Sequence, residues 1–407
     1  MAGPGAYCFG DEERQEVMDV LESGHLSRYG DLNDPSFKHK VYSFEQEFSE
    51  HCEVEHTIAT SSGTASLLIS ILALGICPGD EVLVPGYTYV ASISSIIYAQ
   101  ATPVLVEIDE SLNINPLDIE KKITDKTKAI MVVHMLGNPC DMSAIMEIAK
   151  RHNLFVIEDG CQAIGASYRG KKVGSFGNLG VFSLNRYKMI AGEGGVITTN
   201  DDVLYQRAFA IHDQGHRPHR SSKYAAGSLI GLNLKMNELT GAVALAQVRK
   251  LDTMLKILRA NKKVLKNKLA DIPGIKFRVI NDDAGECATL LTVIFDSKEK
   301  ADRVAEQLGI KTLVHSGWHV YSNMEQIIDH RTPTNNWSVA SRYSTPGSLP
   351  MTDDILSRSV NISIGVVDEG LGSSFGINIH SDKDEIETIA QKFIEACGAN
   401  SDFERSE

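Results

Sequence analysis

The sequence predicts an α/β fold in which a mostly parallel sheet occupies the first 250 residues and a smaller α+β domain follows. The first observation is that short apolar runs alternate with helical patterns between residues 56 and 201, as in βαβ units. The second is a change of pattern after Leu245, where a long helical segment precedes fewer strands. We therefore expect two domains, residues 1–250 and 251–407.

The first domain should contain seven strands. We expect them at 56–61, 81–85, 103–109, 128–137, 154–159, 180–185 and 194–201, with helices at 63–75, 89–100 and 142–153. In open parallel sheets, ligands bind in the loops beyond the carboxyl ends of the strands. Functional residues should therefore follow the segments SSG, VPGY, VIED and FSLN directly.

The second domain should begin with a helical segment at 246–272, whose cationic face we interpret as solvent-exposed. A strand at 289–296, a helix at 298–309, a strand at 361–367 and a closing helix at 382–397 should follow.

Composition excludes several classes of protein. The net charge of −13 argues against nucleic acid or an anionic membrane as a partner. The longest uncharged stretch, Val82–Val106, is interrupted by two prolines and a glycine, so we expect no membrane span. The seven cysteines are scattered without a CxxC pair, which predicts neither a disulfide framework nor a zinc site. Because no signal peptide is visible, we expect a cytoplasmic protein. Because the cysteines show no metal-ligand spacing, we expect that it needs no metal.

The segment SSGTAS at 61–66 lies between an expected strand and helix. Gly63 permits close backbone approach, and Thr64 offers a hydroxyl and an early helix amide. Free amides at a helix N-terminus form an anion site that suits a phosphate. The alternative is an ordinary capped turn.

The segment VIEDGCQAIG at 156–165 ends an apolar strand with Asp159. A buried carboxylate needs a cationic partner, and a protonated pyridine nitrogen would serve. The alternative is a helix N-cap. Gln162, one helical turn later, would hydrogen-bond either a ligand hydroxyl or the backbone.

Lys188 lies in FSLNRYKMIAGEGG, between a strand and a glycine-rich turn. A lysine that bonds covalently to a carbonyl must lose its proton readily, and partial burial promotes this. Ser183 could donate to a phosphate. In VPGYTYVAS, Tyr89 would either stack on a ligand ring or pack in the core.

The order of these motifs (GT, PxxTY, EDxxQ, Sx4K and GEGG) resembles the DegT/StrS family of pyridoxal phosphate (PLP)-dependent sugar aminotransferases. The resemblance covers nearly the whole chain. It implies the aspartate aminotransferase fold (fold type I), with a mostly parallel seven-stranded sheet in the large domain.

The resemblance also implies roles for individual residues. Lys188 matches the lysine that forms a Schiff base with PLP, and Asp159 matches the carboxylate on the pyridine nitrogen. Gln162 matches the residue beside the ring hydroxyl, and Tyr89 the stacking aromatic. The phosphate ligands correspond to Gly63, Thr64 and Ser183.

Asn233, in GLNLKMNELTGAVALAQVRKLD, matches an asparagine that reaches the phosphate of the other subunit, which implies a homodimer with shared active sites. One departure is the short KMIAGEGG spacing, which could move Lys188 or the glycine turn from the usual place.

The implied reaction moves an amino group from glutamate or glutamine to a keto or aldehyde sugar, with pyridoxamine phosphate formed between the half-reactions. Other readings are a PLP- or pyridoxamine phosphate-dependent sugar dehydratase and a non-enzymatic regulator on the same fold. Related dehydratases carry histidine at the lysine position, and a regulator would lose Lys188 or Asp159.

The acceptor stays open at this stage. The chain from SSGTASL (61–67) through GWHVYSNM (317–324) is similar to transaminases of 8-amino-3,8-dideoxy-octulosonate, while nucleotide-linked keto sugars and inososes are alternatives. The loop at 212–224 contains His212, Arg217 and Arg220, which would bind an anionic acceptor or form a solvated loop. Trp318 and His319 would contact the acceptor or pack in the small domain.

Overall fold

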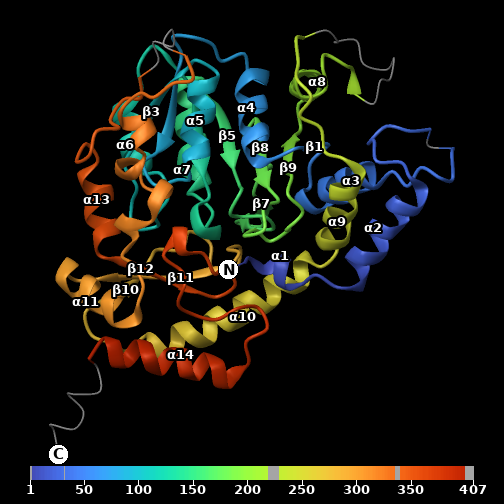
Figure 1. Cartoon of the computed structure of the whole chain (residues 1–407). Helices are drawn as coiled ribbons and strands as arrows, with labels where there is room; N and C mark the ends of the chain where they lie inside the picture. Colours follow the sequence, from blue (N-terminus) through green and yellow to red (C-terminus); the bar gives the residue numbers. More distant parts are fainter. Residues whose placement is uncertain (1, 32, 219–228, 335–339, 399–407) are drawn as a thin grey trace, which may run out of the picture.

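The computed structural model describes residues 2–31, 33–218, 229–334 and 340–398. A seven-stranded sheet with helices on both faces forms the upper part of the molecule in Figure 1, and a smaller group of helices and strands from the end of the chain lies below it. The strands of the large sheet are β1 (His56–Thr60), β2 (Glu81–Pro85), β3 (Thr102–Val106), β4 (Thr127–Val133), β5 (Phe155–Asp159), β8 (Leu179–Ser183) and β9 (Gly195–Thr199).

The order of strands across the sheet is β1-β9-β8-β5-β4-β2-β3. Strand β9 is antiparallel to both of its neighbours, β1 and β8, and the other pairings are parallel. The connection from β8 to β9 is a short loop, which can only join antiparallel neighbours. The predicted mostly parallel seven-stranded sheet is therefore confirmed.

Alternating residues of the strands form two apolar layers. Val82 and Val84 pack with helices α4 (Gly63–Ala73) and α5 (Val90–Tyr98), whereas Leu83 faces helices α6 (Pro116–Lys122) and α7 (Met142–His152). Helix α8 (Asp202–His212) extends the first layer over β1 and β9. The sheet is covered on both faces, as parallel sheets require.

The first fifty residues form three helices, α1 (Pro4–Tyr7), α2 (Asp11–Ser23) and α3 (Lys40–Cys52). Helices α2 and α3 pack against α9 (Glu238–Val248), which lies beside them in Figure 1. The core cluster on this side also includes Phe48 of α3, whose ring meets Phe182 of β8 edge-on at 5.2 Å between ring centres.

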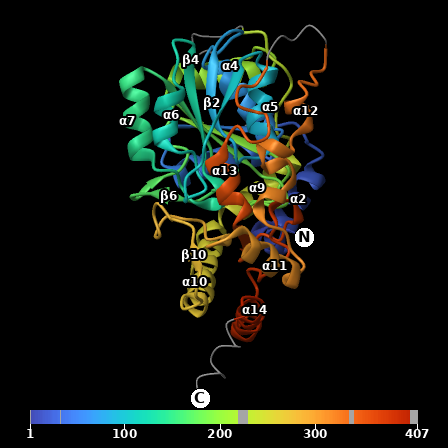
Figure 2. The ribbon, with the colours of Figure 1, turned by 90° about the vertical axis from the view of Figure 1, so that its left-hand side faces the viewer.

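The rest of the chain builds a three-stranded antiparallel sheet of β10 (Ile275–Phe277), β11 (Leu290–Phe295) and β12 (Ser359–Ser363). Helices α10 (Leu251–Leu269) and α14 (Lys383–Ala396) lie side by side below this sheet (Figures 1 and 2). Apart from short 3₁₀ helices, the remaining elements of the described residues are β6 (Ser167–Tyr168), β7 (Lys171–Lys172), α11 (Lys298–Leu308), α12 (Glu325–Ile328) and α13 (Pro350–Ser357). The division of the chain at residue 250 stays a prediction.

Three predicted elements differ from the structure. The strand expected at 128–137 ends at Val133, because the chain turns into a short 3₁₀ helix (Met135–Gly137) in which Leu136 has a positive φ. The helical segment expected at 246–272 is split between α9 and α10, because the amide of Lys250 closes a turn on the Gln247 carbonyl before α10 begins. The strand expected at 361–367 ends at Ser363, because the amides of Ile364 and Gly365 both bond to the Thr289 carbonyl and end the ladder. The chain then turns toward the large sheet.

Within the described ranges, no helix combines the length and apolar character needed to cross a membrane.

Candidate active site

A cavity of about 660 Å³ lies at the carboxyl ends of the parallel strands, where the topology predicts it. Its walls include these predicted site residues: Gly63, Thr64, Tyr89, Asp159, Gln162, Ser183, Lys188, Trp318 and His319. They come from segments more than 250 residues apart, which the fold brings to one place.

Lys188 projects into the cavity from the loop between β8 and β9. Two backbone hydrogen bonds of Leu184 hold the base of this loop. The Leu184 amide donates to the Gly194 carbonyl at 2.8 Å, and the Leu184 carbonyl accepts the Glu193 amide at 2.7 Å. The amide of Lys188 closes a turn on the carbonyl of Asn185 at 2.8 Å. The short spacing from Lys188 to GEGG therefore leaves this lysine in the cavity.

The amino-terminal segment supports the same loop from outside. The amide of Gly3 donates to the carbonyl of Arg186 at 2.9 Å, and that of Gly5 donates to the carbonyl of Lys188 at 3.2 Å. A Cβ atom on Gly3 would lie 2.2 Å from the carbonyl carbon of Tyr187, so only glycine permits this approach. Sequence reasoning missed this support because residues 2–5 show no motif of their own.

Asp159 ends β5 and is almost completely buried. One carboxylate oxygen accepts a hydrogen bond from the Ser92 hydroxyl at 2.8 Å, and the other from the Cys161 amide at 3.1 Å. The Ser92 hydroxyl also bonds to Thr88 at 2.7 Å. Both donors are neutral, and Asp159 forms no ion pair with any residue that the structure describes. The carboxylate therefore presents an uncompensated charge to the cavity, where a cationic ligand would stabilise it.

Its neighbour Glu158 points to the opposite face of β5 and is fully buried. Its carboxylate accepts the amides of Phe176 and Gly177 at 2.7 Å each and that of Gly174 at 2.9 Å. The His134 ring nitrogen lies 3.3 Å away. Glu158 therefore fixes the segment before β8, while Asp159 faces the cavity.

The start of α4 forms an anion cradle. Ser62 caps the helix by accepting the amide of Ala65 at 3.1 Å, which leaves the earlier amides of Gly63 and Thr64 for a ligand. Ser183 closes the cradle from β8: a Cβ atom on Gly63 would lie 2.7 Å from its Cβ. A Cβ atom on Gly195 would lie 2.3 Å from the Ser62 backbone, so both glycines are needed for the close packing.

Gln162 and Tyr89 lie on different walls. The side-chain oxygen of Gln162 accepts the amide of Leu136 at 2.9 Å, which directs its NH₂ group elsewhere. Tyr89 precedes α5 and remains 45% exposed, so it is not an ordinary core residue. Its ring centre lies 5.1 Å from that of His319, with the planes inclined by 49°.

The wall from the second half of the chain contains Trp318, His319, Asp368 and Gly370. Trp318 is 54% exposed, and His319 is buried. Asp368 was missed by sequence reasoning, because it follows directly after an expected strand and has no recognisable motif.

The DegT/DnrJ/EryC1/StrS aminotransferase family matches residues 7–366. The chain belongs to this family. It is 42% identical to GDP-perosamine synthase of Caulobacter vibrioides over 60% of this chain, and the match spans 63% of that protein, just under two thirds of its length. It is 38% identical to dTDP-3-amino-3,6-dideoxy-alpha-D-galactopyranose transaminase of Aneurinibacillus thermoaerophilus, over 88% of this chain and 91% of that protein.

Solved structures agree with this family assignment. An aminotransferase from Psychrobacter cryohalolentis superposes with a TM-score of 0.80 at 27% identity, over 96% of this chain and 98% of that one. Escherichia coli GDP-4-keto-6-deoxy-D-mannose-3-dehydratase superposes with a TM-score of 0.78 over 97% of this chain and 99% of that one, but at 20% identity it shows the fold alone.

Three of the predicted residues that the structure describes, His212, Arg217 and Asn233, do not line the cavity. His212 was wrong as a substrate contact: it ends α8 inside the core, bonded to the Phe209 carbonyl at 2.5 Å and in contact with Arg28. Burial, with the nearby Arg28 charge, lowers its pKa to about 3. Arg217 is exposed outside the cavity, and Arg220 lies outside the described residues.

Asn233 is also exposed and away from the cavity of its own chain. It pairs with Asp213 in an isolated β-bridge. Asp213 in turn accepts hydrogen bonds from Tyr29 and Lys235, each at 2.6 Å, which fix the position of this segment.

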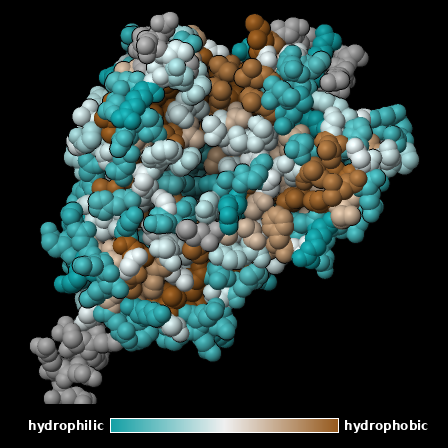
Figure 3. Space-filling view, in the orientation of Figure 1, coloured by the Kyte–Doolittle hydropathy of each residue, from teal (hydrophilic) through white to brown (hydrophobic). Residues whose placement is uncertain are grey.

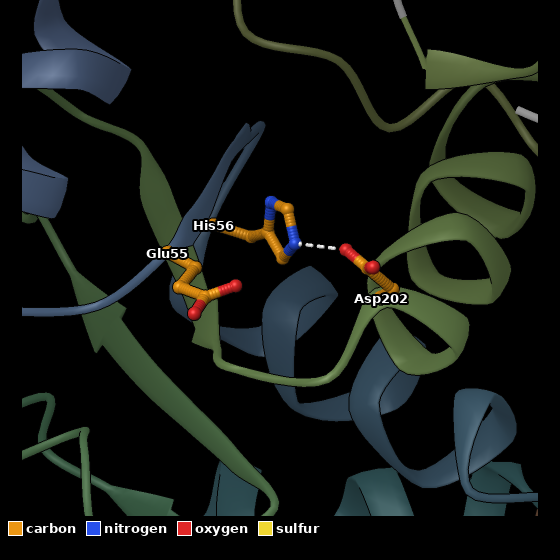
Figure 4. A group of neighbouring side chains, drawn as sticks. All are labelled: Glu55, His56 and Asp202. Carbon is orange, nitrogen blue, oxygen red and sulfur yellow. Dashed lines mark hydrogen bonds and ion pairs between the residues drawn. The ribbon is translucent and has the colours of Figure 1, made fainter. Parts of the chain in front are cut away.

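Among the described residues, one group of side chains could together hold a metal ion: Glu55, His56 and Asp202 (Figure 4). It lies where β1 begins, at the end of that strand away from the cavity. His56 Nε2 bonds to Asp202 at 2.7 Å, and Glu55 lies beside them. The His56 ring stacks on Tyr205 with centres 4.2 Å apart, so it already has partners on both sides. The expectation that the enzyme needs no metal stays a prediction.

Proposed function

We propose that this protein is a PLP-dependent aminotransferase that moves an amino group from glutamate or glutamine to a keto or aldehyde sugar in amino-sugar biosynthesis. The observation that carries the proposal is that one cavity contains a lysine, an uncompensated buried carboxylate and a helix N-terminus. Family membership and the names of the two relatives support the same reaction class.

The residues present fit the cofactor. The amides of Gly63 and Thr64 and the Ser183 hydroxyl would hold its phosphate, in a cradle that any larger side chain at residue 63 would fill. Asp159 would pair with the pyridinium nitrogen and so gain the cation that it lacks. When bound, PLP supplies an electron sink for charge that develops at the substrate carbon.

The remaining residues would orient these groups. Tyr89 is available to stack on the pyridine ring, and Gln162, anchored through its oxygen, would turn its NH₂ group toward the ring hydroxyl. Ser92 would keep the Asp159 carboxylate aligned by donating to it. The Lys188 amine would hold the cofactor covalently and, once released, move the proton taken from the α-carbon of the donor.

We also propose a homodimer in which Asn233 reaches the cofactor phosphate of the partner. Ile230 and Leu232, next to Asn233, are 100% and 59% exposed, which a partner would cover. Met18 and Leu21 of α2 are exposed as well, and Figure 3 shows an apolar patch on the side of the molecule where α2 and α3 lie. The contact of Arg217 and Arg220 with the acceptor stays a prediction.

The relatives favour a nucleotide-linked keto sugar as the acceptor. The eight-carbon octulosonate and the inososes stay alternatives. Seven cysteines without a disulfide support a cytoplasmic location as part of this proposal.

The test uses the PLP-loaded enzyme with glutamate or glutamine as the donor. We expect the absorbance to shift to the pyridoxamine form with release of the matching keto acid, 2-oxoglutarate from glutamate, and Lys188→Ala to abolish the shift. Borohydride reduction and peptide mapping should find the label on Lys188. An unlabelled Lys188, or no shift with either donor, would contradict the proposal and favour a dehydratase or a regulator.

A further inference from the structure

The peptide unit of Gly370 holds two side chains of the cavity wall in place. Its amide donates to Oδ1 of Asp368 at 2.8 Å, and its carbonyl lies 3.0 Å from Nδ1 of His319. All three residues line the cavity. The two side chains are therefore neighbours with fixed orientation, although they lie 49 positions apart in the chain.

The free ring nitrogen of His319 is a hydrogen-bond acceptor. Nδ1 faces the carbonyl oxygens of Gly370 and Ser316, at 3.0 and 3.3 Å, so it must carry the hydrogen. Burial, reinforced by the positive charge of Lys188, lowers the pKa of the ring to about 4. The ring is neutral at pH 7, and Nε2, which bonds to none of the described residues, keeps its lone pair.

Asp368 supplies a second acceptor. One oxygen is occupied by the Gly370 amide, and the other forms no hydrogen bond with any part of the chain that the structure describes. Burial raises the pKa of the Asp368 carboxyl above its ordinary value. The Gly370 amide and the charge of Lys188 each act to lower it, but burial has the larger effect. The His319 and Asp368 side chains thus present two acceptor atoms that no described residue occupies.

This chemistry selects the ligand group that fits. Carboxylate and phosphate oxygens are acceptors, so the donor amino acid's carboxylates and any acidic group of the acceptor are repelled by Asp368. Hydroxyl groups of a sugar can donate to both atoms. Because both side chains line the same cavity as Lys188, these hydroxyls would lie on the side of the sugar that faces the reacting carbon.

We propose that Asp368 and His319 bind hydroxyl groups of the acceptor on the carbon atoms beside its carbonyl, and so select keto sugars that keep a hydroxyl next to the keto group. The inference rests on the proposed function and adds the hydroxyl requirement to it. Any acidic group of the acceptor then lies on another side of the cavity.

The experiment compares GDP-4-keto-6-deoxy-D-mannose, which has a hydroxyl beside its keto group, with its 3-deoxy analogue. Binding is followed by the fluorescence of Trp318 at the cavity, in a Trp337→Phe background that leaves one tryptophan of the two. We expect the parent protein to bind the hydroxylated sugar about 10- to 100-fold more tightly, as for a hydrogen bond to a charged group.

The variants keep the Gly370 contacts and change only the atoms that face the cavity. Asp368→Asn retains an oxygen for the Gly370 amide, and His319→Asn retains an NH group in place of Nδ1. The single hydroxyl beside the keto group donates one hydrogen bond, so at least one of the two variants should weaken binding of the hydroxylated sugar about tenfold and leave the deoxy analogue unchanged, which shrinks the discrimination. Asp382→Asn, at the exposed start of α14, is the control and should behave like the parent.

The donor half-reaction separates this inference from the proposed function. It should keep the parental rate in Asp382→Asn and lose a smaller factor than the binding of the hydroxylated sugar in Asp368→Asn and His319→Asn, and its absence from the parent protein would refute the proposed function itself. The proposal would be overturned if the parent bound the two sugars equally or bound neither. It would also be overturned if both variants kept the parental discrimination, or if they lost the donor half-reaction by the same factor as sugar binding. Unfolding midpoints within about 3 °C of the parent show that the variants are folded.

Discussion

Replacing each of two adjacent carboxylates on β5 by its amide should have opposite consequences. In Glu158→Gln, an NH₂ group takes the place of an oxygen that accepts two hydrogen bonds, either from the amides of Phe176 and Gly177 or from the Gly174 amide and the His134 ring. Each orphaned donor costs about 1–3 kcal/mol, so with two of them we expect the free energy of unfolding to fall by about 2–6 kcal/mol. The chemistry should continue at a rate within about threefold of the parent in dilute buffer, because the side chain points away from the cavity.

Asp159→Asn should leave the cofactor-free protein as stable as the parent, or stabilise it, because the substitution removes a buried charge without a cationic partner. Its amide group can still pair with Ser92 and the Cys161 amide. Turnover should fall about 10²–10³-fold, the usual loss when one charge-stabilising group is removed from an active site.

Urea unfolding of the cofactor-free proteins, followed by circular dichroism, measures the first effect, and steady-state turnover measures the second. The reasoning would be refuted if Glu158→Gln unfolded at the parental urea concentration, or if Asp159→Asn kept more than a tenth of parental turnover.

Three further predictions concern the loop and the core. Lys188→Ala should lower turnover more than about 10³-fold, measured in single-turnover assays with glutamate, and a smaller loss would contradict its role. Gly3→Ala should lower turnover about 10²-fold with little change in the unfolding midpoint, because the added methyl group would displace the backbone at Tyr187. Gly10→Ala is the control, since its methyl group would come nearest to the end of the flexible Glu12 side chain, at 3.1 Å. Because the pKa of His212 falls to about 3 on folding, the unfolded chain binds more protons below pH 6.5, and stability should fall as the pH drops. At pH 5 this one group should cost about 2 kcal/mol, and His212→Asn should flatten the urea-unfolding profile between pH 7 and 5; an unchanged slope would show that His212 is not the cause.

The seven strands of the sheet could be predicted because buried parallel strands are continuous apolar runs, and their bounds agree within four residues at each end. The order of the strands and the reversed direction of β9 could not, since pairing depends on contacts between distant segments. Helices α2 and α3 went unpredicted because their sequences are mostly polar and their apolar sides become clear only when they pack on α9.

The residues of the candidate site could likewise be predicted only where they follow a local sequence pattern. Asp159 and Lys188 could be found because each follows a recognisable strand at the edge where ligands bind. Asp368 and the support from Gly3 depend on tertiary contacts that leave no local pattern. His212 was misplaced because its neighbours are polar and basic in sequence, whereas the ring itself turns back into the core.

The contacts of the amino-terminal segment have a consequence for biosynthesis. Gly5 bonds to the loop of Lys188, and the carbonyl of Ala2 accepts the amide of Val367, next to Asp368. Residues 2–5 are therefore held between the loop of Lys188 and a segment that follows them by more than 360 residues. A nascent polypeptide can assemble the large sheet during translation, but the catalytic loop acquires its outer brace only after synthesis has passed residue 367. Competence should consequently appear only once residue 367 has left the ribosome, and a translation-arrest series should reveal that step.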